Sequence, residues 1–133
     1  MKVLVLGGDG FCGWPCAVNL ADQGHEVLII DNLSRRKIDI DLEVESLTPI
    51  SSIGERLQAW EQLGGKPMRF VHMDIAHEYQ RLLDLLIEER PDSVVHFAEQ
   101  RAAPYSMKSS ATCLLYTSPS PRDLSTSRMP SSA

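Results

Sequence analysis

A short apolar run that ends in a glycine-rich turn, close to the start of the chain, constrains the fold more than any other feature. Val3–Leu6 has the length and composition of a buried strand. It leads directly into the turn letters Gly7-Gly8-Asp9-Gly10, and Gly13 follows three residues later. From Phe11 to Gln23 the apolar residues recur with the spacing of a helix. Strand, tight turn and helix in this order predict the first unit of an α/β sheet.

The same alternation continues along the chain. The apolar patterns predict three more strands and one strongly amphipathic helix, at Glu26–Ile30, Met68–His72, Ser93–Phe97 and Glu78–Arg90. Alternating strands and helices favour a doubly wound parallel sheet with right-handed crossovers, truncated after the fourth strand.

Two segments between these elements need separate predictions. Ser51 or Ser52 can cap a helix, because Glu55 stands three residues after Ser52 as in a capping box, and this helix is expected to run to Leu63. The preceding residues, 32–50, form a polar connection longer than is usual between a strand and a helix.

The glycine spacing carries the chemistry. In Gly7-x-x-Gly10-x-x-Gly13 the glycines allow a tight turn, a close backbone approach to a pyrophosphate and close helix–strand packing. The N-terminus of the following helix offers free N–H groups to phosphates. Asp31 ends the second strand, 18 residues after Gly13, where an acid binds the ribose hydroxyls of a dinucleotide. We therefore predict a Rossmann-like domain that binds NAD, because a carboxylate repels the additional phosphate of NADP.

Alternatives remain open at these residues. The glycine turn can serve packing alone, with Asp31 a solvated acid. Arg35 and Arg36 follow Asp31 closely and could meet the 2′-phosphate of NADP, although Asp31 outweighs them. The short basic run Arg35-Arg36-Lys37 favours a solvated loop, and contact with a substrate is the alternative.

Charge and composition exclude several function classes. The 133 residues carry 13 Lys and Arg against 18 Asp and Glu, a net charge of −5, which gives no electrostatic footprint for nucleic acid. No apolar run approaches the ~20 residues of a membrane span. Because the first strand begins next to Met1, we expect no signal or transit peptide and a cytoplasmic location. Three Cys without paired spacing indicate a reducing compartment.

The last residues differ in composition from the rest. Eleven of the 21 residues at 113–133 are Ser, Pro or Thr, so we expect a disordered tail after an amino-terminal part of an NAD-binding domain at 1–112. Cys113–Ser118 is also what TGT-CTC-TTA-TAC-ACA-TCT encodes, which resembles the mosaic end of a transposase-based sequencing adapter, and Ser127–Ala133 resembles its distal primer. We interpret this tail as translated adapter sequence.

Four stretches carry a resemblance to a known family. GGDGFCGW, DNLSRR, ESLTPI and SVVHFAEQRAAPYSM, at 7–14, 31–36, 45–50 and 93–107, resemble the UDP-sulfoquinovose synthase family of extended short-chain dehydrogenases. The resemblance covers essentially all of residues 1–112, and the last two stretches are its specific part. It implies a tightly bound NAD, with UDP-glucose and sulfite as substrates and a homodimer at full length.

The resemblance also implies site residues. Those matching the cofactor turn, the ribose segment and the adenine side are Gly7, Gly10, Phe11, Cys12, Gly13, Asp31, Asn32, Leu33, Ser34, Arg35, Asp74 and Ile75. Arg101 is a candidate contact for the substrate phosphate or sulfite. The superfamily's Tyr-x-x-x-Lys dyad is absent from the chain, and Tyr105 with Lys108 has the wrong spacing. We therefore expect no catalytic residue here and no activity of the chain itself.

Other candidates favour structural roles. Cys12 and Cys16 lie one helical turn apart without the partners of a zinc site, which indicates helix packing and no metal. His96 is expected to be a hydrogen-bonded core residue, and Trp60 to form a core face with Leu57 and Leu63. Two other functions stay open: another NAD-dependent nucleotide-sugar epimerase or dehydratase, or a non-catalytic dinucleotide sensor.

Overall fold

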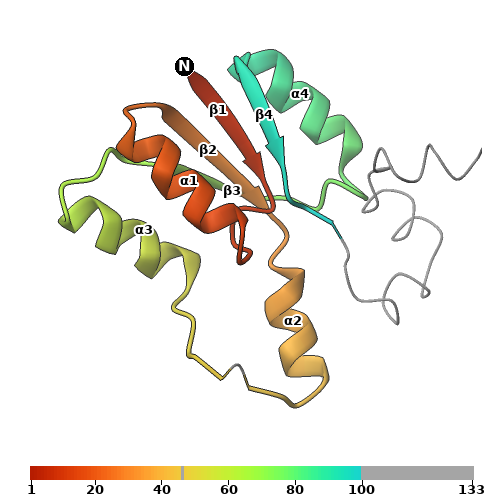
Figure 1. Ribbon diagram of the computed structural model, residues 1–133. Coiled ribbons are helices and arrows are strands. Elements are labelled where there is room, and N and C mark those ends of the chain that lie inside the picture. The colour runs from red at the N-terminus through yellow and green to blue at the C-terminus, as the bar shows by residue number, and fades with distance from the viewer. Residues whose placement is uncertain (46, 100–133) are drawn as a thin grey trace, which may run out of the picture. The chain divides into compact units, whose positions relative to one another are not determined.

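Four strands and four helices make up the part of the chain that a computed structural model describes, residues 1–45 and 47–99. In chain order they are β1 (Lys2–Leu6), α1 (Gly13–Asp22), β2 (Glu26–Asp31), α2 (Ser34–Asp41), α3 (Ile53–Gln62), β3 (Arg69–His72), α4 (Tyr79–Glu89) and β4 (Ser93–His96). Residues 1–98 form one compact unit, shown in colour in Figure 1.

The four strands form one parallel sheet in the order β3-β2-β1-β4. β1 therefore lies between its neighbours, with Leu4 opposite Leu28 of β2 and Val94 of β4. The chain crosses from β3 over β2 and β1 to β4. Because all four strands are parallel, their carboxyl ends lie along the same edge of the sheet. The predicted doubly wound parallel sheet is confirmed.

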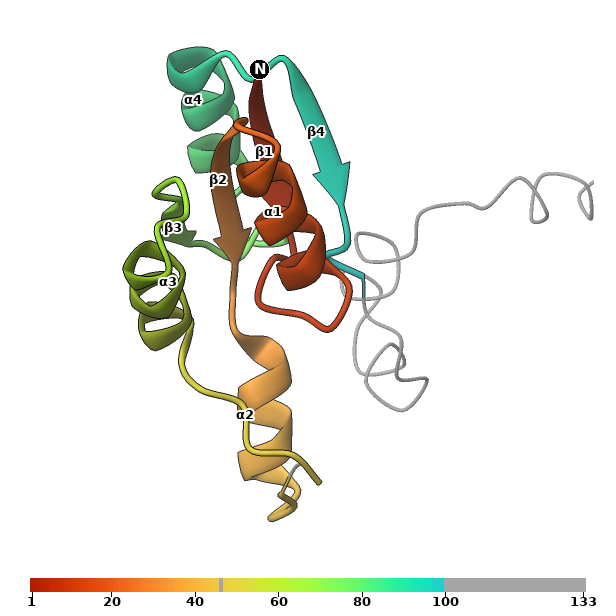
Figure 2. The ribbon, with the colours of Figure 1, turned by 60° about the vertical axis from the view of Figure 1, so that its left-hand side comes forward.

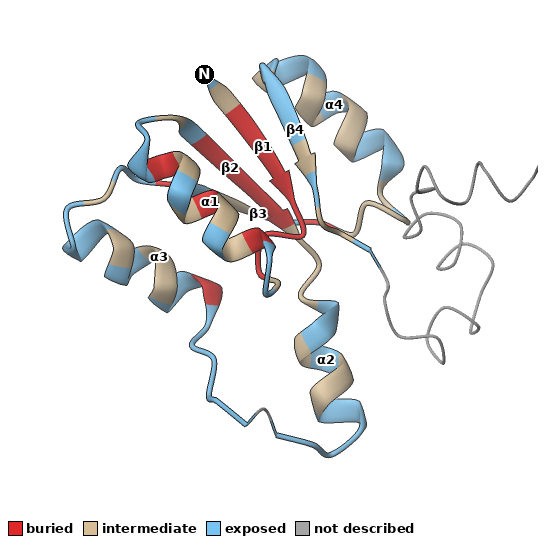
Figure 3. Cartoon of the chain, viewed as in Figure 1, coloured by how far each residue is buried: buried red, intermediate tan, exposed pale blue. Residues whose placement is uncertain are grey.

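Both faces of the sheet are covered by helices, which explains why its central strands are continuous apolar runs. Side chains alternate along β1, so Val3 and Val5 pack with α1 and with Leu57 and Trp60 of α3. Leu4 and Leu6 face the other way, toward the apolar side of α4. Figure 2 shows α1 and α3 on one side of the strands and α4 on the other, and Figure 3 shows the buried residues concentrated in β1, β2 and the inner side of α1.

Helix α2 corrects the prediction of a purely polar connection over residues 32–50. Ser34–Asp41 is helical although none of its residues is buried, so it has no apolar stripe for a periodicity argument to detect. Its first turn is held locally, because the Oδ1 of Asn32 accepts a hydrogen bond of 3.0 Å from the N–H of Ser34. The residue before the helix, Leu33, has a left-handed backbone with φ 55°.

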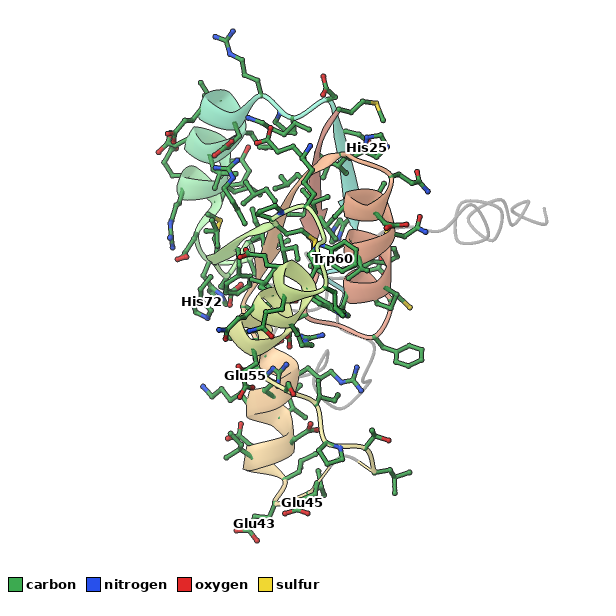
Figure 4. All side chains as sticks on the ribbon, turned by 90° about the vertical axis from the view of Figure 1, so that its left-hand side faces the viewer. His25, Glu43, Glu45, Glu55, Trp60 and His72 are labelled. Atoms are coloured by element: carbon green, nitrogen blue, oxygen red, sulfur yellow. The ribbon has the colours of Figure 1, made fainter. Side chains whose placement is uncertain are left out.

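Helix α3 begins as its sequence predicts. The Oγ of Ser52 accepts from the N–H of Glu55 at 3.3 Å, and the carboxylate of Glu55 accepts from the N–H of Ser52 at 2.8 Å, which completes the capping box. Trp60 packs against the core as expected, and Figure 4 shows it on the side of α3 that faces the sheet. Leu63 does not join that face: it follows the last helical residue and is 83% exposed.

The prediction for His96 was wrong in its burial. The side chain is exposed, and β4 is the edge strand of the sheet in the described residues. Its hydrogen bond is local, since Nδ1 accepts from the N–H of Ala98 at 3.1 Å. Among residues 1–45 and 47–99, no helix is long and apolar enough to cross a membrane.

Candidate functional site

The glycine turn joins β1 to α1 at the carboxyl edge of the sheet. Gly7 has φ +79°, and a Cβ on it would lie 2.6 Å from the backbone N of Ala98, so only glycine fits. A Cβ on Gly13 would overlap the carbonyl oxygen of Gly7. The N–H of Gly10 donates to that same oxygen at 3.3 Å, which closes the turn. Close backbone packing therefore requires glycine at positions 7 and 13. Both lie at the edge where open α/β sheets bind ligands.

Asp31 is the last residue of β2 and is held against this turn. Its Oδ2 accepts a hydrogen bond of 2.9 Å from the N–H of Asp9, and its Oδ1 accepts one of 2.7 Å from the N–H of Leu33. The carboxylate is only partly exposed, and burial raises the pKa of Asp31 against the lowering effect of these two backbone hydrogen bonds. Each carboxylate oxygen keeps acceptor capacity for another donor.

The other predicted residues surround the same edge. Asn32 continues from Asp31, and its carbonyl oxygen lies 3.3 Å from Nε2 of His72 at the end of β3. The N–H of Met73 donates to the carbonyl oxygen of Asp31 at 3.1 Å, so the residues after β3 are tied to β2. Asp74 follows directly, with its Oδ1 accepting from the N–H of Ala76. Ile75 packs against the core on the α4 side of the sheet.

Three predicted residues on the turn and α2 have exposed side chains. Phe11 is 82% exposed, and Cys12 and Arg35 are also exposed. The prediction that Cys12 serves helix packing was therefore wrong: it precedes α1, whose buried residues are Gly13, Ala17 and Ala21. Arg101, Tyr105, Lys108 and the tail at 113–133 lie outside the described residues.

A charged cluster beside Asp31 was not predicted. The carboxylate of Asp9, whose side chain is 6% exposed, receives Nε and Nη2 of Arg36, each at 2.8 Å. Nη2 of Arg56 also donates to Oδ1 of Asp9. The guanidinium of Arg56 stacks on the ring of Trp14, 4.5 Å from its centroid. These contacts connect the glycine turn, α1, α2 and α3.

The cluster forms one wall of an open cleft of about 1040 Å³. Its lining comes from the turn and the start of α1, from α2, from the segment after α2 and from α3: Asp9, Gly10, Phe11, Cys12, Trp14, Pro15, Arg35, Arg36, Asp39, Ile40, Glu45, Pro49, Ile50 and Arg56. Figure 4 places Glu45 on the segment after α2 and Glu55 at the start of α3. Of the predicted site residues, Gly10, Phe11, Cys12 and Arg35 line this cleft.

Sequence reasoning missed Asp9, Trp14 and Arg56 because their partners are distant in sequence. Asp9 bonds residues 27 and 47 positions away. The one available signal was an acid placed between the glycines of a turn that is expected to receive phosphate. Arg36, which the sequence left open as a phosphate contact or a solvated residue, is instead paired with that acid.

Comparison with known proteins places this chain in a family. The model of the NAD-dependent epimerase/dehydratase family matches residues 3–117, which is most of the chain. The chain belongs to this family.

Two relatives with curated names support the narrower resemblance. One is UDP-sulfoquinovose synthase, chloroplastic, of Spinacia oleracea, which is 45% identical to this chain over 106 residues. The other is UDP-sulfoquinovose synthase of Sulfolobus acidocaldarius, which is 44% identical over 107 residues. Each alignment covers 80% of this chain but only 22% and 27% of the respective relative. The chain thus spans about a quarter of the length of these relatives.

Solved structures of UDP-glucose 4-epimerases have the same fold. The UDP-glucose 4-epimerase of Stenotrophomonas maltophila, with bound NAD and formylated UDP-arabinopyranose, has a TM-score of 0.59 at 30% identity. The UDP-glucose 4-epimerase of Bifidobacterium longum, in complex with NAD+ and UDP, has a TM-score of 0.57 at 27% identity. Each match covers 87% of this chain and 29% of the solved one. The predicted fold class and the prediction of an NAD-dependent family are confirmed.

Proposed function

We propose that the chain binds NAD at the edge of the sheet where β1 and β2 end. One observation carries the proposal, the hydrogen bond from the N–H of Asp9 to the carboxylate of Asp31. It holds a glycine-rich turn, of the kind that binds phosphates, next to an acid at the end of β2, of the kind that binds ribose. In a doubly wound sheet these are the two features that recognise a dinucleotide.

The residues present fit this cofactor. Gly10 and Gly13 have no side chain to block the approach of a ligand to the backbone, and a Cβ at either position would crowd the carbonyl oxygen of Gly7. Helix α1 begins at Gly13. N–H groups at a helix N-terminus suit a pyrophosphate. Asp31 would accept hydrogen bonds from the ribose hydroxyls. Asp74 and Ile75 would lie on the adenine side, since they follow the strand that pairs with β2.

The remaining proposed contacts are Phe11 and Cys12 beside the turn and residues 32–35 beside the ribose. When bound, NAD would supply reversible hydride transfer. The residues of this chain would bind and orient it, and the carboxylate of Asp31 would disfavour the 2′-phosphate of NADP by repulsion.

For a protein of the relatives' full length that carries this segment, we propose the conversion of UDP-glucose and sulfite to UDP-sulfoquinovose and water. The 45% identity to the spinach relative supports this reaction. Arg101 is proposed as an anion contact for the substrate, and a homodimer as the assembly. The chain contains no Tyr-x-x-x-Lys pair, so the 133-residue chain is proposed to bind NAD without catalysing the reaction.

A second candidate is a UDP-sugar 4-epimerase. The observation that favours it is the fold similarity to the Stenotrophomonas enzyme at 30% identity. Sulfite distinguishes the two candidates, because it is consumed in the first reaction and takes no part in the second.

The binding proposal is tested by titrating the chain with NADH and NADPH and following energy transfer from its two tryptophans. Trp14 lines the cleft beside the turn and is therefore the expected donor. We expect saturable transfer to NADH and at least about tenfold weaker binding of NADPH, because of repulsion by Asp31. Absence of saturable NADH binding by a chain that shows a cooperative unfolding transition would contradict the proposal.

The reaction is tested separately on a full-length protein that carries residues 1–112. The expected result is that UDP-glucose is consumed only when sulfite is present, with formation of a sulfonated UDP-sugar. Formation of UDP-galactose without sulfite would instead support the 4-epimerase.

A further inference from the structure

We infer that Asp9 is a specificity-determining positioning residue. It neutralises and orients the guanidinium groups of Arg36 and Arg56 beside Asp31, so that neither is available to the 2′-phosphate of NADP. The inference rests on the proposed NAD function and adds a reason for the cofactor preference that Asp31 alone does not provide.

The position of Asp9 is unusual for an acid. It lies inside the turn that is proposed to receive a negatively charged pyrophosphate, where a carboxylate works against anion binding. Its side chain is almost fully buried and is paired with two guanidinium groups, those of Arg36 and Arg56. A buried carboxylate of this kind is stable only because it is paired and hydrogen-bonded.

Arg36 is the group that most needs such control. Arginine is the residue best suited to bind a phosphate with two parallel hydrogen bonds. Here its Nε and Nη2 make the parallel pair with Asp9 instead. Two further hydrogen bonds run from Nη1 to the carbonyl oxygen of Ile50 at 3.2 Å and from Nη2 to that of Ser51 at 2.9 Å. The hydrogen bonds to Asp9 raise the pKa of Arg36, so the charge is permanent.

The two arginines lie near Asp31, where the ribose of the cofactor is proposed to bind. Arg36 lies on α2, five residues after Asp31, and its partner Asp9 donates its N–H to the Asp31 carboxylate. Within the group formed by Asp9, Asp31, Arg36 and Arg56, two negative charges balance two positive charges. Removing the charge of Asp9 leaves a net positive charge next to the place where NADP carries about two additional negative charges.

The backbone role of Asp9 can be separated from its side-chain role. Asp9→Asn keeps the N–H that bonds Asp31 and nearly the same volume, but it removes the charge and one acceptor oxygen. Asp41→Asn is the matched control, because it also removes one negative charge. Asp41 lies on α2, like Arg36, but at an exposed position outside the cleft. Asp9→Glu tests rescue, since it restores the carboxylate.

The experiment measures dissociation constants of NAD and NADP by calorimetry on the 133-residue chain and these variants. For Asp9→Asn we expect the preference for NAD over NADP to fall by roughly tenfold, the size of one added charge-assisted hydrogen bond. Asp41→Asn should leave the preference unchanged, and Asp9→Glu should restore much of it. Adding Arg36→Gln to Asp9→Asn should remove the gain for NADP. Asp9→Ser, measured in parallel, gives the same readout if the Asn variant does not fold.

The outcomes separate the two proposals. If the parent chain folds cooperatively but binds neither nucleotide, the proposed function fails, and this inference fails with it. If the parent binds NAD but Asp9→Asn and Asp9→Ser keep its preference, or if both lose affinity for the two nucleotides equally, Asp9 has only a structural role and the inference alone is overturned.

Discussion

The N–H of Asp9 donates a 2.9 Å hydrogen bond to the carboxylate of Asp31, joining two residues 22 positions apart in the chain. This contact explains how two local sequence signals become one site. The glycine turn is shaped by backbone crowding around Gly7, whereas Asp31 is placed by the pairing of β2 with β1. The hydrogen bond between them sets the acid at the turn, where burial raises the pKa of Asp31.

Gly13 is predicted to be essential for the turn. In Gly13→Ala the new Cβ would overlap the carbonyl oxygen of Gly7, so we expect a loss of about 1–3 kcal/mol in the free energy of unfolding. The matched control is Gly54→Ala in α3, where nothing lies within 4 Å of the new Cβ. That variant should be more stable than the parent by about 0.5–1 kcal/mol. Urea unfolding followed by circular dichroism measures both, and equal effects of the two substitutions would contradict the account of the turn.

Ser52 is predicted to stabilise α3 through its capping box. Ser52→Ala removes the oxygen that accepts from the N–H of Glu55 and should cost about 1 kcal/mol of unfolding free energy. Ser51→Ala is the control, because Ser51 contributes its backbone carbonyl, not its hydroxyl, to Arg36. Thermal unfolding of the two variants should show a lower midpoint for Ser52→Ala alone. A larger effect at Ser51 would place the cap one residue earlier.

Glu89 connects the end of α4 to the sheet. Its carboxylate accepts from Nη1 and Nη2 of Arg69 at 2.8 and 2.7 Å and from Nζ of Lys2 at 3.1 Å. The hydrogen bonds from Arg69, followed by those from Lys2, depress the pKa of Glu89 from 4.5 to about 2. Because the pKa is lower in the folded chain than in the unfolded one, this network stabilises the fold above pH 4.5 and ceases to do so as the pH falls toward 2.

We therefore predict that Glu89→Gln lowers the unfolding free energy at pH 7 by on the order of 1 kcal/mol, a value limited by the partial exposure of the network. The difference from the parent should shrink below pH 4.5 and disappear near pH 2. Glu88→Gln removes the same charge from the neighbouring, exposed residue and should have little effect. Urea unfolding across this pH range is the measurement. A deficit of Glu89→Gln that stays constant with pH would mean that packing, not charge, makes its contribution.

The sequence predicted the parts of the fold that depend on local pattern. Val3–Leu6, the capping box at Ser52 and the amphipathic helix before Pro91 are each visible within a few residues, and each was found with small changes in its ends. Helix α2 was missed because it buries no residue, and a hydrophobic period requires a buried face.

The candidate site divides in the same way. Gly7, Gly10, Gly13 and Asp31 were predicted from spacing, because a strand, a turn and the next strand fix their relative places. The pairing of Asp9 with Arg36 and Arg56 could not be predicted, since it depends on how α2 and α3 return to the turn. The exposure of His96 likewise depends on the place of β4 in the strand order, which the residues near His96 in the sequence do not determine.

The most direct test of the central claim is a calorimetric titration of NAD into the chain and into Asp31→Ala. If the Asp31 carboxylate binds the ribose hydroxyls, the variant should lose about 1–3 kcal/mol of NAD binding free energy. Asp41→Ala, which removes an exposed acid from the end of α2, should bind NAD like the parent. Equal NAD affinity in the parent and in a folded Asp31→Ala variant would contradict the assignment of this edge of the sheet as the cofactor site.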